Sequence, residues 1–90
     1  MPEPEGHGSI GLRALGETVK RLRIERGLGP CGLAFDAEIS EATLTDLEKG
    51  DKEPRWGTLR RIARGLGMEL PAILARAEEL EDEMKRERGD

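Results

Sequence analysis

The chain has 90 residues, a formal net charge of −4, 38% charged residues and 36% hydrophobic residues. A chain of this length forms one small domain, and so few apolar residues exclude a large core. No apolar run reaches the length of a membrane span, and no basic segment precedes an apolar one as in a secretion signal. The single cysteine excludes an internal disulfide. That suits a reducing compartment, and we expect a cytoplasmic protein.

The acidic charge is concentrated at the two ends of the chain. Residues 1–11 carry a net charge of −2, residues 12–67 a net charge of +2, and residues 68–90 a net charge of −4. An acidic chain is at first an unfavourable partner for nucleic acid. The weakly basic central segment nevertheless leaves room for phosphate contacts.

Residues 1–11 are predicted to form a disordered tail. They contain two prolines and three glycines and almost nothing apolar. The only histidine, His7, lies in this tail with no second ligand nearby, so we expect no metal site and no cofactor.

Three short helices are predicted between residues 12 and 50. In the first, over residues 12–26, apolar side chains recur at helical spacing, at Leu15, Val19 and Leu22. The second begins at Pro30, because proline is tolerated in a first helical turn. The third covers residues 41–49: Ser40 precedes it as an N-cap and Gly50 follows it as a stop. Leu44 and Leu47 form its buried stripe.

Two further helices are predicted after a loop over residues 51–56. The fourth covers residues 58–66, with a buried stripe of Leu59, Ile62, Ala63 and Leu66. The fifth runs from Pro71 to about residue 88, and apolar residues step through it by 4, 3 and 4 positions, which is a short a/d seam: Ile73, Ala77, Leu80 and Met84. Two interpretations of this seam stay open. It is a dimer contact, or it belongs to a solvated extension that continues the packing of the fourth helix.

Two short helices joined by a tight turn, the second with a capping serine, are typical of a helix-turn-helix. The sequence resembles the phage repressor and Cro family of DNA-binding proteins, also called the xenobiotic-response-element (XRE) type. The matching segments are residues 22–28, Leu33-Ala34, Ile39-Ser40, Leu44, residues 47–50, Pro54-Arg55 and residues 59–67. The resemblance covers residues 15–74.

This resemblance implies an all-α, five-helix lambda-repressor-like domain. It further implies that the protein binds duplex DNA sequence-specifically and regulates transcription as a repressor. A homodimer is expected from geometry instead, because one short helix contacts few bases and a doubled half-site is the ordinary way to reach useful affinity. The chain then divides into the tail (1–11), the helix-turn-helix domain (12–74) and a charged C-terminal helix extension that is a candidate dimer contact (75–90).

The resemblance also assigns roles to individual residues. Four residues match positions that read base edges in the major groove: Ser40, Glu41, Ala42 and Asp46. Thr45 shares their exposed face. The best candidates for phosphate contacts are the cations that follow: Lys49, Lys52 and Arg55. Arg23 and Glu48 match a structural ion pair that fixes the recognition helix on its scaffold. Trp56 is expected to cover the core as a hydrophobic cap rather than to contact DNA.

The sequence departs from the family at four positions. Pro30 stands near the place of a glutamine that commonly contacts a phosphate or a base, and Glu38 stands where glycine is usual, so a positive φ there costs of order 1 kcal/mol. Glu41 and Asp46 make the recognition helix acidic. A carboxylate can accept a hydrogen bond from cytosine N4, but it repels phosphates. For Glu41, base readout and stabilisation of the helix both stay open.

These departures support an alternative function. The helix-turn-helix fold would serve as a protein-interaction module, such as an antitoxin, with weak or no DNA binding. An enzyme is not expected, because no constellation of a nucleophile, a base or a metal ligand set accompanies the carboxylates.

Overall fold

The computed structural model describes residues 11–89, which form five helices and, within that range, no strand. The helices are α1 (Leu12–Glu25), α2 (Pro30–Ala37), α3 (Glu41–Lys49), α4 (Trp56–Leu66) and α5 (Leu70–Glu87). The predicted all-α class is confirmed. The predicted disordered tail, apart from Gly11, lies outside the described residues, as does His7.

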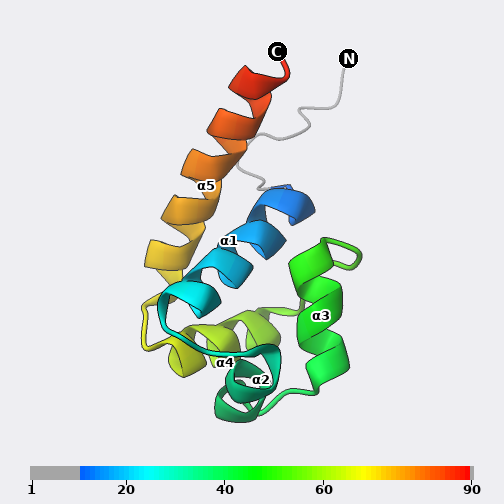
Figure 1. Cartoon of the computed structure of the whole chain (residues 1–90), viewed down its shortest axis with the longest axis vertical. Coiled ribbons are helices and arrows are strands. Elements are labelled where there is room, and N and C mark those ends of the chain that lie inside the picture. The colour runs from blue at the N-terminus through cyan, green and yellow to red at the C-terminus, as the bar shows by residue number, and fades with distance from the viewer. Residues whose placement is uncertain (1–10, 90) are drawn as a thin grey trace.

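The helices are arranged around α1, which crosses the middle of the molecule (Figure 1). α3 lies on one side of α1 and α5 on the other, while α2 and α4 lie together beneath it (Figure 1). The largest fully buried side chains come from all five helices: Val19, Leu22, Leu33, Leu44, Ile62 and Ile73. Burial of each such side chain contributes about 1.5–3 kcal/mol, so one shared core holds the helices in place.

The limits of the helices agree closely with those expected from the sequence. α3 has the predicted bounds, whereas α4 begins two residues earlier than predicted, at Trp56. Arg55 keeps an extended backbone (φ −73°, ψ 154°) as the residue before α4. No residue type in the loop marks that boundary, because neither Arg55 nor Trp56 is a strong helix start.

The seam of α5 is buried within the chain. Ile73, Ala77 and Leu80 are 1%, 0% and 7% exposed, and α5 packs mainly on α1. These three side chains are therefore closed to a second copy. α1 thus supplies an apolar partner for these three members of the seam. Met84, the fourth member, is only half-buried, so the dimer contact over residues 75–90 stays a prediction.

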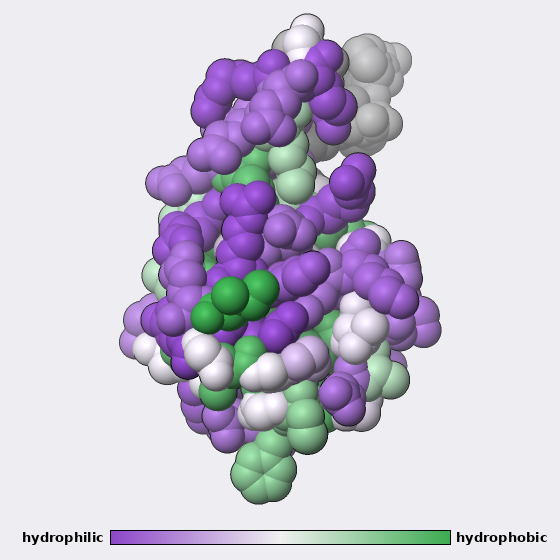
Figure 2. All heavy atoms as spheres, in the orientation of Figure 1, coloured by the Kyte–Doolittle hydropathy of each residue, from purple (hydrophilic) through white to green (hydrophobic). Residues whose placement is uncertain are grey.

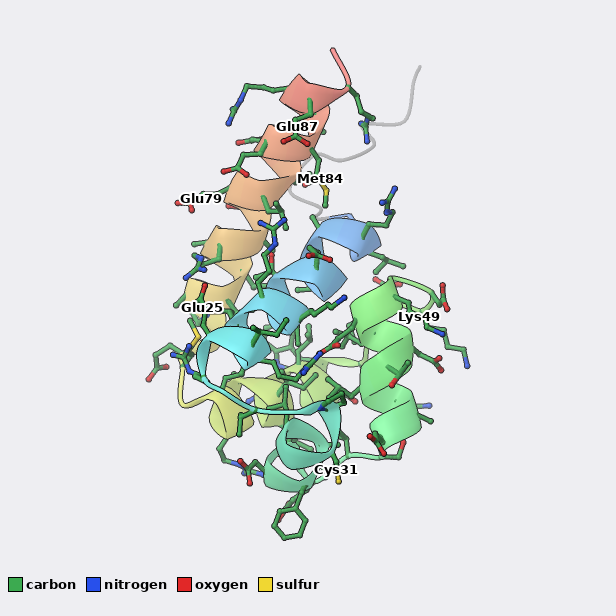
Figure 3. All side chains as sticks on the ribbon, in the orientation of Figure 1. Glu25, Cys31, Lys49, Glu79, Met84 and Glu87 are labelled. Carbon is green, nitrogen blue, oxygen red and sulfur yellow. The ribbon has the colours of Figure 1, made fainter. Side chains whose placement is uncertain are left out.

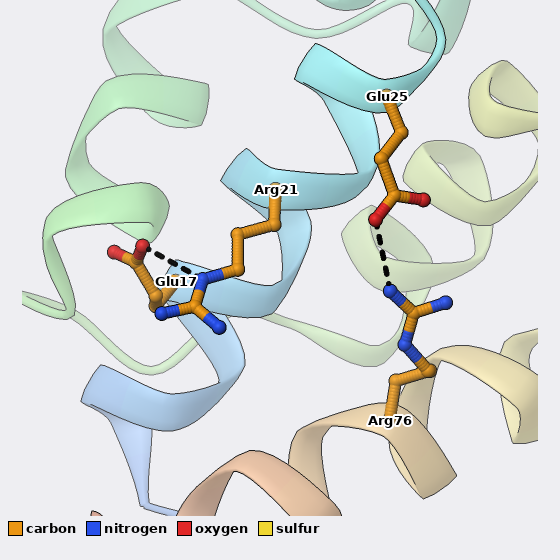
Figure 4. A network of polar contacts seen from close by, with 4 residues as sticks. All are labelled: Glu17, Arg21, Glu25 and Arg76. Carbon is orange, nitrogen blue, oxygen red and sulfur yellow. Dashed lines mark hydrogen bonds and ion pairs between the residues drawn. The ribbon is translucent and has the colours of Figure 1, made fainter.

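Polar contacts also join α1 to α5. Arg76 Nη2 lies 3.1 Å from Glu25 Oε2, beside a second ion pair within α1 between Arg21 and Glu17 (Figure 4). At the other end of α1, the Gly11 N–H donates to Glu81 Oε2 over 2.9 Å. Exposed ion pairs each contribute less than about 1 kcal/mol, so they support the α1–α5 packing rather than cause it.

Three large apolar side chains within residues 11–89 are exposed. Ile24 is 57%, Phe35 82% and Trp56 63% exposed. Trp56 is thus not the hydrophobic cap expected from the sequence, because leucine, isoleucine, valine and alanine side chains fill the core. Figure 2 shows green side chains on an otherwise largely hydrophilic face, and the projecting end of α5 is hydrophilic. None of the described helices has the length and apolarity needed to cross a membrane.

Candidate nucleic-acid interface

The turn between α2 and α3 sets the angle at which α3 leaves the domain. Glu38 ends α2 in the left-handed conformation (φ 61°, ψ 45°), as the glycine-like position in the sequence predicted. This conformation costs a residue with a side chain about 1–2 kcal/mol. Arg61 Nη1 donates to the Glu38 carbonyl over 3.3 Å, and Ile39 packs against the core behind the turn. The strained residue is thus held from α4.

The first turn of α3 is capped by Ser40. Its Oγ accepts the Thr43 N–H over 3.0 Å and donates to Thr43 Oγ1 over 2.8 Å. The predicted N-cap is confirmed. Because the Ser40 hydroxyl is used within the helix, a base contact through it would compete with the cap. The Thr43 hydroxyl, in contrast, keeps its own proton to donate outward.

Arg23 and Glu48 lock α3 against α1. Arg23 Nε donates to Glu48 Oε2 over 2.8 Å and Nη2 to Oε1 over 3.0 Å, with both side chains about nine-tenths buried. Arg23 Nη1 also donates to the Leu28 carbonyl over 3.0 Å. The hydrogen bond to Glu48 raises the pKa of Arg23 above its ordinary value, so this guanidinium stays charged.

Gly16 is a second anchor, which the sequence interpretation missed. A Cβ at this position would lie 2.3 Å from the Leu47 carbonyl oxygen and 2.7 Å from that of Glu48. The backbones of α1 and α3 therefore touch here, and only glycine fits. The available signal was a glycine inside a strongly amphipathic helix, where it costs about 1 kcal/mol unless packing requires it.

The outer face of α3 carries most of the predicted base-facing residues. Ser40, Glu41 and Ala42 are exposed, whereas Thr45 and Asp46 are half-buried. Thr43 is also exposed, although the sequence interpretation did not assign it. The structure thus brings the predicted residues together on one face and adds a hydroxyl to it.

A groove of about 320 Å³ runs between α3 and the loop that follows it. Its lining includes Thr43, Asp46, Lys52, Glu53, Arg55 and Thr58. Lys52 Nζ lies 3.8 Å from Asp46 Oδ2, so one acidic side chain of α3 is partly neutralised. Glu53 adds an acid to this groove that the sequence interpretation overlooked.

The three predicted phosphate-contacting cations occupy different places. Lys49 is exposed at the end of α3 and points into solvent (Figure 3). Lys52 and Arg55 line the groove. Arg55 precedes α4, whose first turn has no side-chain cap, so its N–H groups are open to an anion. Within residues 11–89, no group of three or more His, Cys, Asp or Glu side chains is placed to hold a metal ion.

The sequence and the fold are similar to those of known helix-turn-helix proteins. A family model described as a helix-turn-helix domain matches residues 14–77. The immunity repressor protein of Bacillus phage phi105 is 35% identical over 60 residues, which cover 67% of this chain and 42% of the repressor. The chain thus spans less than half the length of that relative.

Solved structures show the same arrangement of helices. The clp gene regulator ClgR from Corynebacterium glutamicum superposes with a TM-score of 0.84 at 23% identity, covering 90% of this chain and 86% of ClgR. A transcriptional regulator from Vibrio cholerae superposes with a TM-score of 0.70 at 31% identity, covering 78% of this chain and 39% of the regulator.

Proposed function

We propose, on the premise that the chain belongs to the helix-turn-helix domain family, that it binds duplex DNA sequence-specifically and regulates transcription as a dimeric repressor. The observation that carries this proposal is the presentation of α3. Its buried side is anchored by Gly16 and by the Arg23–Glu48 pair, while the side chains of residues 41–43 on its outer face are exposed. A rigid helix with one open face is what insertion into a major groove requires.

The contacts with DNA divide into phosphate and base contacts. Lys49, Lys52 and Arg55, with the open N–H groups of α4, bind phosphates and set the register. Base edges are read by the outer face of α3, which presents Ser40, Glu41, Ala42, Thr45 and Asp46. In this proposal the Glu41 carboxylate accepts a hydrogen bond from cytosine N4, and Ala42 touches a thymine methyl group.

The repressor and dimer parts of the proposal have separate support. The phi105 relative is named as an immunity repressor, which favours repression. A single nine-residue helix contacts few bases, so two copies on two half-sites supply the usual affinity and specificity. Such a protein works in the compartment that holds the DNA, which in a bacterium is the cytoplasm.

A protein-interaction module is the second candidate function. Two observations favour it: Glu41 lies exposed at the start of α3, and the Phe35 side chain on α2 is 82% exposed. Residues 27–35, which end at Phe35, carry no charge, and Pro30 lacks an N–H for a phosphate. An antitoxin-like partner would cover this surface.

The test is a fluorescence-anisotropy titration with duplexes from the promoter region of its own gene and with scrambled duplexes. The wild type should prefer a promoter duplex, and the double variant Glu41→Arg/Asp46→Gln should lose that preference. If the acidic face instead excludes DNA, the wild type will bind neither duplex and the double variant will bind both. That second pattern would contradict DNA binding by the wild type and favour the protein-interaction module.

A further inference from the structure

A second groove lies beside α4, and no residue of α3 lines it. It has a volume of about 350 Å³ and runs from α4 to the start of α5, between Trp56, Met68 and Pro71. Its floor is apolar, because Ala63 and Leu70 in its lining are only 5% and 9% exposed. At one end stands Trp56, 63% exposed and the only tryptophan in the chain.

The rim of this groove carries charges of both signs. Arg60 and Arg64 lie on the α4 side and Glu69 on the α5 side. The Arg64 guanidinium already lies 3.5 Å from Glu38. Arg60 and Glu69 are exposed, and neither forms an ion pair or side-chain hydrogen bond with any residue from 11 to 89. The groove therefore combines an apolar floor with one cation, Arg60, and one anion, Glu69, that form no ion pair with the described residues.

A surface of this kind is complementary to itself. In a two-fold dimer each contact occurs twice, so one patch must supply both members of every pair. We infer that two copies of this chain pair across this groove, with Arg60 of each copy facing Glu69 of the other and Trp56 covering the apolar floor of its partner. Exposed tryptophan and arginine side chains are the residues that most often dominate an interface.

This inference rests on the dimer part of the proposed function and names the surface that forms it. Ile73, Ala77 and Leu80 of the α5 seam are buried within the chain, so these side chains do not compete for this role. Trp56 directly follows Arg55, a proposed phosphate contact, so the pairing surface would begin beside the DNA-binding loop. The occupant is a second copy rather than a uniformly acidic or uniformly basic peptide, because a partner of one sign would attract either Arg60 or Glu69 on the rim but repel the other.

The experiment uses two charge reversals, Arg60→Glu and Glu69→Arg, in sedimentation equilibrium without DNA. Each variant alone would place like charges opposite each other at both pairs, so the dimer dissociation constant should rise roughly tenfold or more. In an equimolar mixture both pairs become opposite charges again, and the mixed dimer should form about as tightly as the wild type. Because the two changes are on different chains, recovery reports only a contact between chains.

The fluorescence of Trp56 supplies an independent measurement. Its emission should shift to longer wavelength when the wild type is diluted below its dissociation constant, and Trp56→Ala should weaken association. A circular dichroism melt checks that every variant is folded. Glu69 directly precedes α5, so Glu69→Gln, which removes the charge without reversing it, serves as a milder substitution there.

Three results would overturn the inference. The mixture could stay monomeric while the wild type dimerises, which places the dimer contact elsewhere and leaves DNA binding intact. The wild type could be monomeric at all concentrations and still bind a promoter duplex, which removes the dimer alone. Arg60→Glu could lower the affinity of a monomer for a single half-site, which would make this groove a nucleic-acid contact.

Discussion

Gly16 shows how one missing side chain positions the whole of α3. A Cβ there would meet two backbone carbonyls of α3, which cannot move aside as a side chain can. We expect Gly16→Ala to lower the free energy of unfolding by about 2 kcal/mol, despite the better helix propensity of alanine. Thermal melting should show a decrease of roughly 8–16 °C in the midpoint.

The control for Gly16 is Gly57→Ala in the first turn of α4. A Cβ at Gly57 meets nothing within 4 Å, so this substitution should be neutral or raise stability by up to about 1 kcal/mol. Equal effects of the two substitutions would show that helix propensity, and not the contact with α3, decides the outcome at residue 16.

Glu38 is the only described residue other than glycine with a positive φ. Glu38→Gly removes the steric conflict of a Cβ at φ 61° and should raise the free energy of unfolding by about 0.5–1 kcal/mol. Glu38→Ala keeps the Cβ and removes only the exposed ion pair with Arg64, so it should change stability by less than about 0.5 kcal/mol. Urea titration measures both. A glycine variant less stable than the alanine variant would mean that the turn is not strained.

At the scale of the elements, α3 depends on the buried pair between Arg23 and Glu48. Glu48→Ala leaves the Arg23 charge buried without its partner and should lower the free energy of unfolding by about 3–5 kcal/mol. Glu17→Ala removes an exposed pair with Arg21 instead and should have an effect below about 1 kcal/mol. Replacing both partners, as Arg23→Met with Glu48→Leu, should recover most of the loss, because no buried charge remains.

The same pair determines how one part of the stability depends on pH. The pKa of Arg23 is raised in the folded protein, so its contribution to stability is complete below the unfolded pKa and is lost only as the pH rises through the folded one. Both values lie in the strongly alkaline range. The change in the free energy of unfolding between pH 6 and pH 9, measured by urea titration, should therefore be the same for the wild type and for Arg23→Met/Glu48→Leu. Unequal changes would mean that another group titrates through this pair.

The sequence predicted the elements well because their signals are local. Ser40 as a cap, Gly50 as a stop and the apolar stripes are each read within one or two turns of helix, and the structure has all of them. The contact at Gly16 and the groove at Trp56 depend on how distant helices pack, which no local pattern records. The α5 seam was ambiguous for the same reason: spacing shows that a face is apolar, but not which helix covers it.

At the scale of the whole molecule, the proposed function requires an acidic protein to bind an acidic polymer. The central residues 12–67 carry only +2, while residues 68–90 carry −4 and continue into the hydrophilic end of α5 (Figure 2). The proposed affinity for DNA therefore has to come from a few well-placed cations, not from overall charge. We expect log K to fall with log salt at about −0.9 per neutralised phosphate, which is roughly −3 per copy for Lys49, Lys52 and Arg55.

Removing one of these cations should change the slope by a fixed amount. Lys52→Ala should make it about 1 unit shallower per copy, and it should weaken binding further because Asp46 loses its partner at 3.8 Å. Lys85→Ala on α5 removes an equal charge remote from α3 and should leave the slope unchanged. Anisotropy titrations at four salt concentrations separate the two. Equal slopes for both variants would mean that Lys52 touches no phosphate, and a slope near zero for the wild type would contradict phosphate binding altogether.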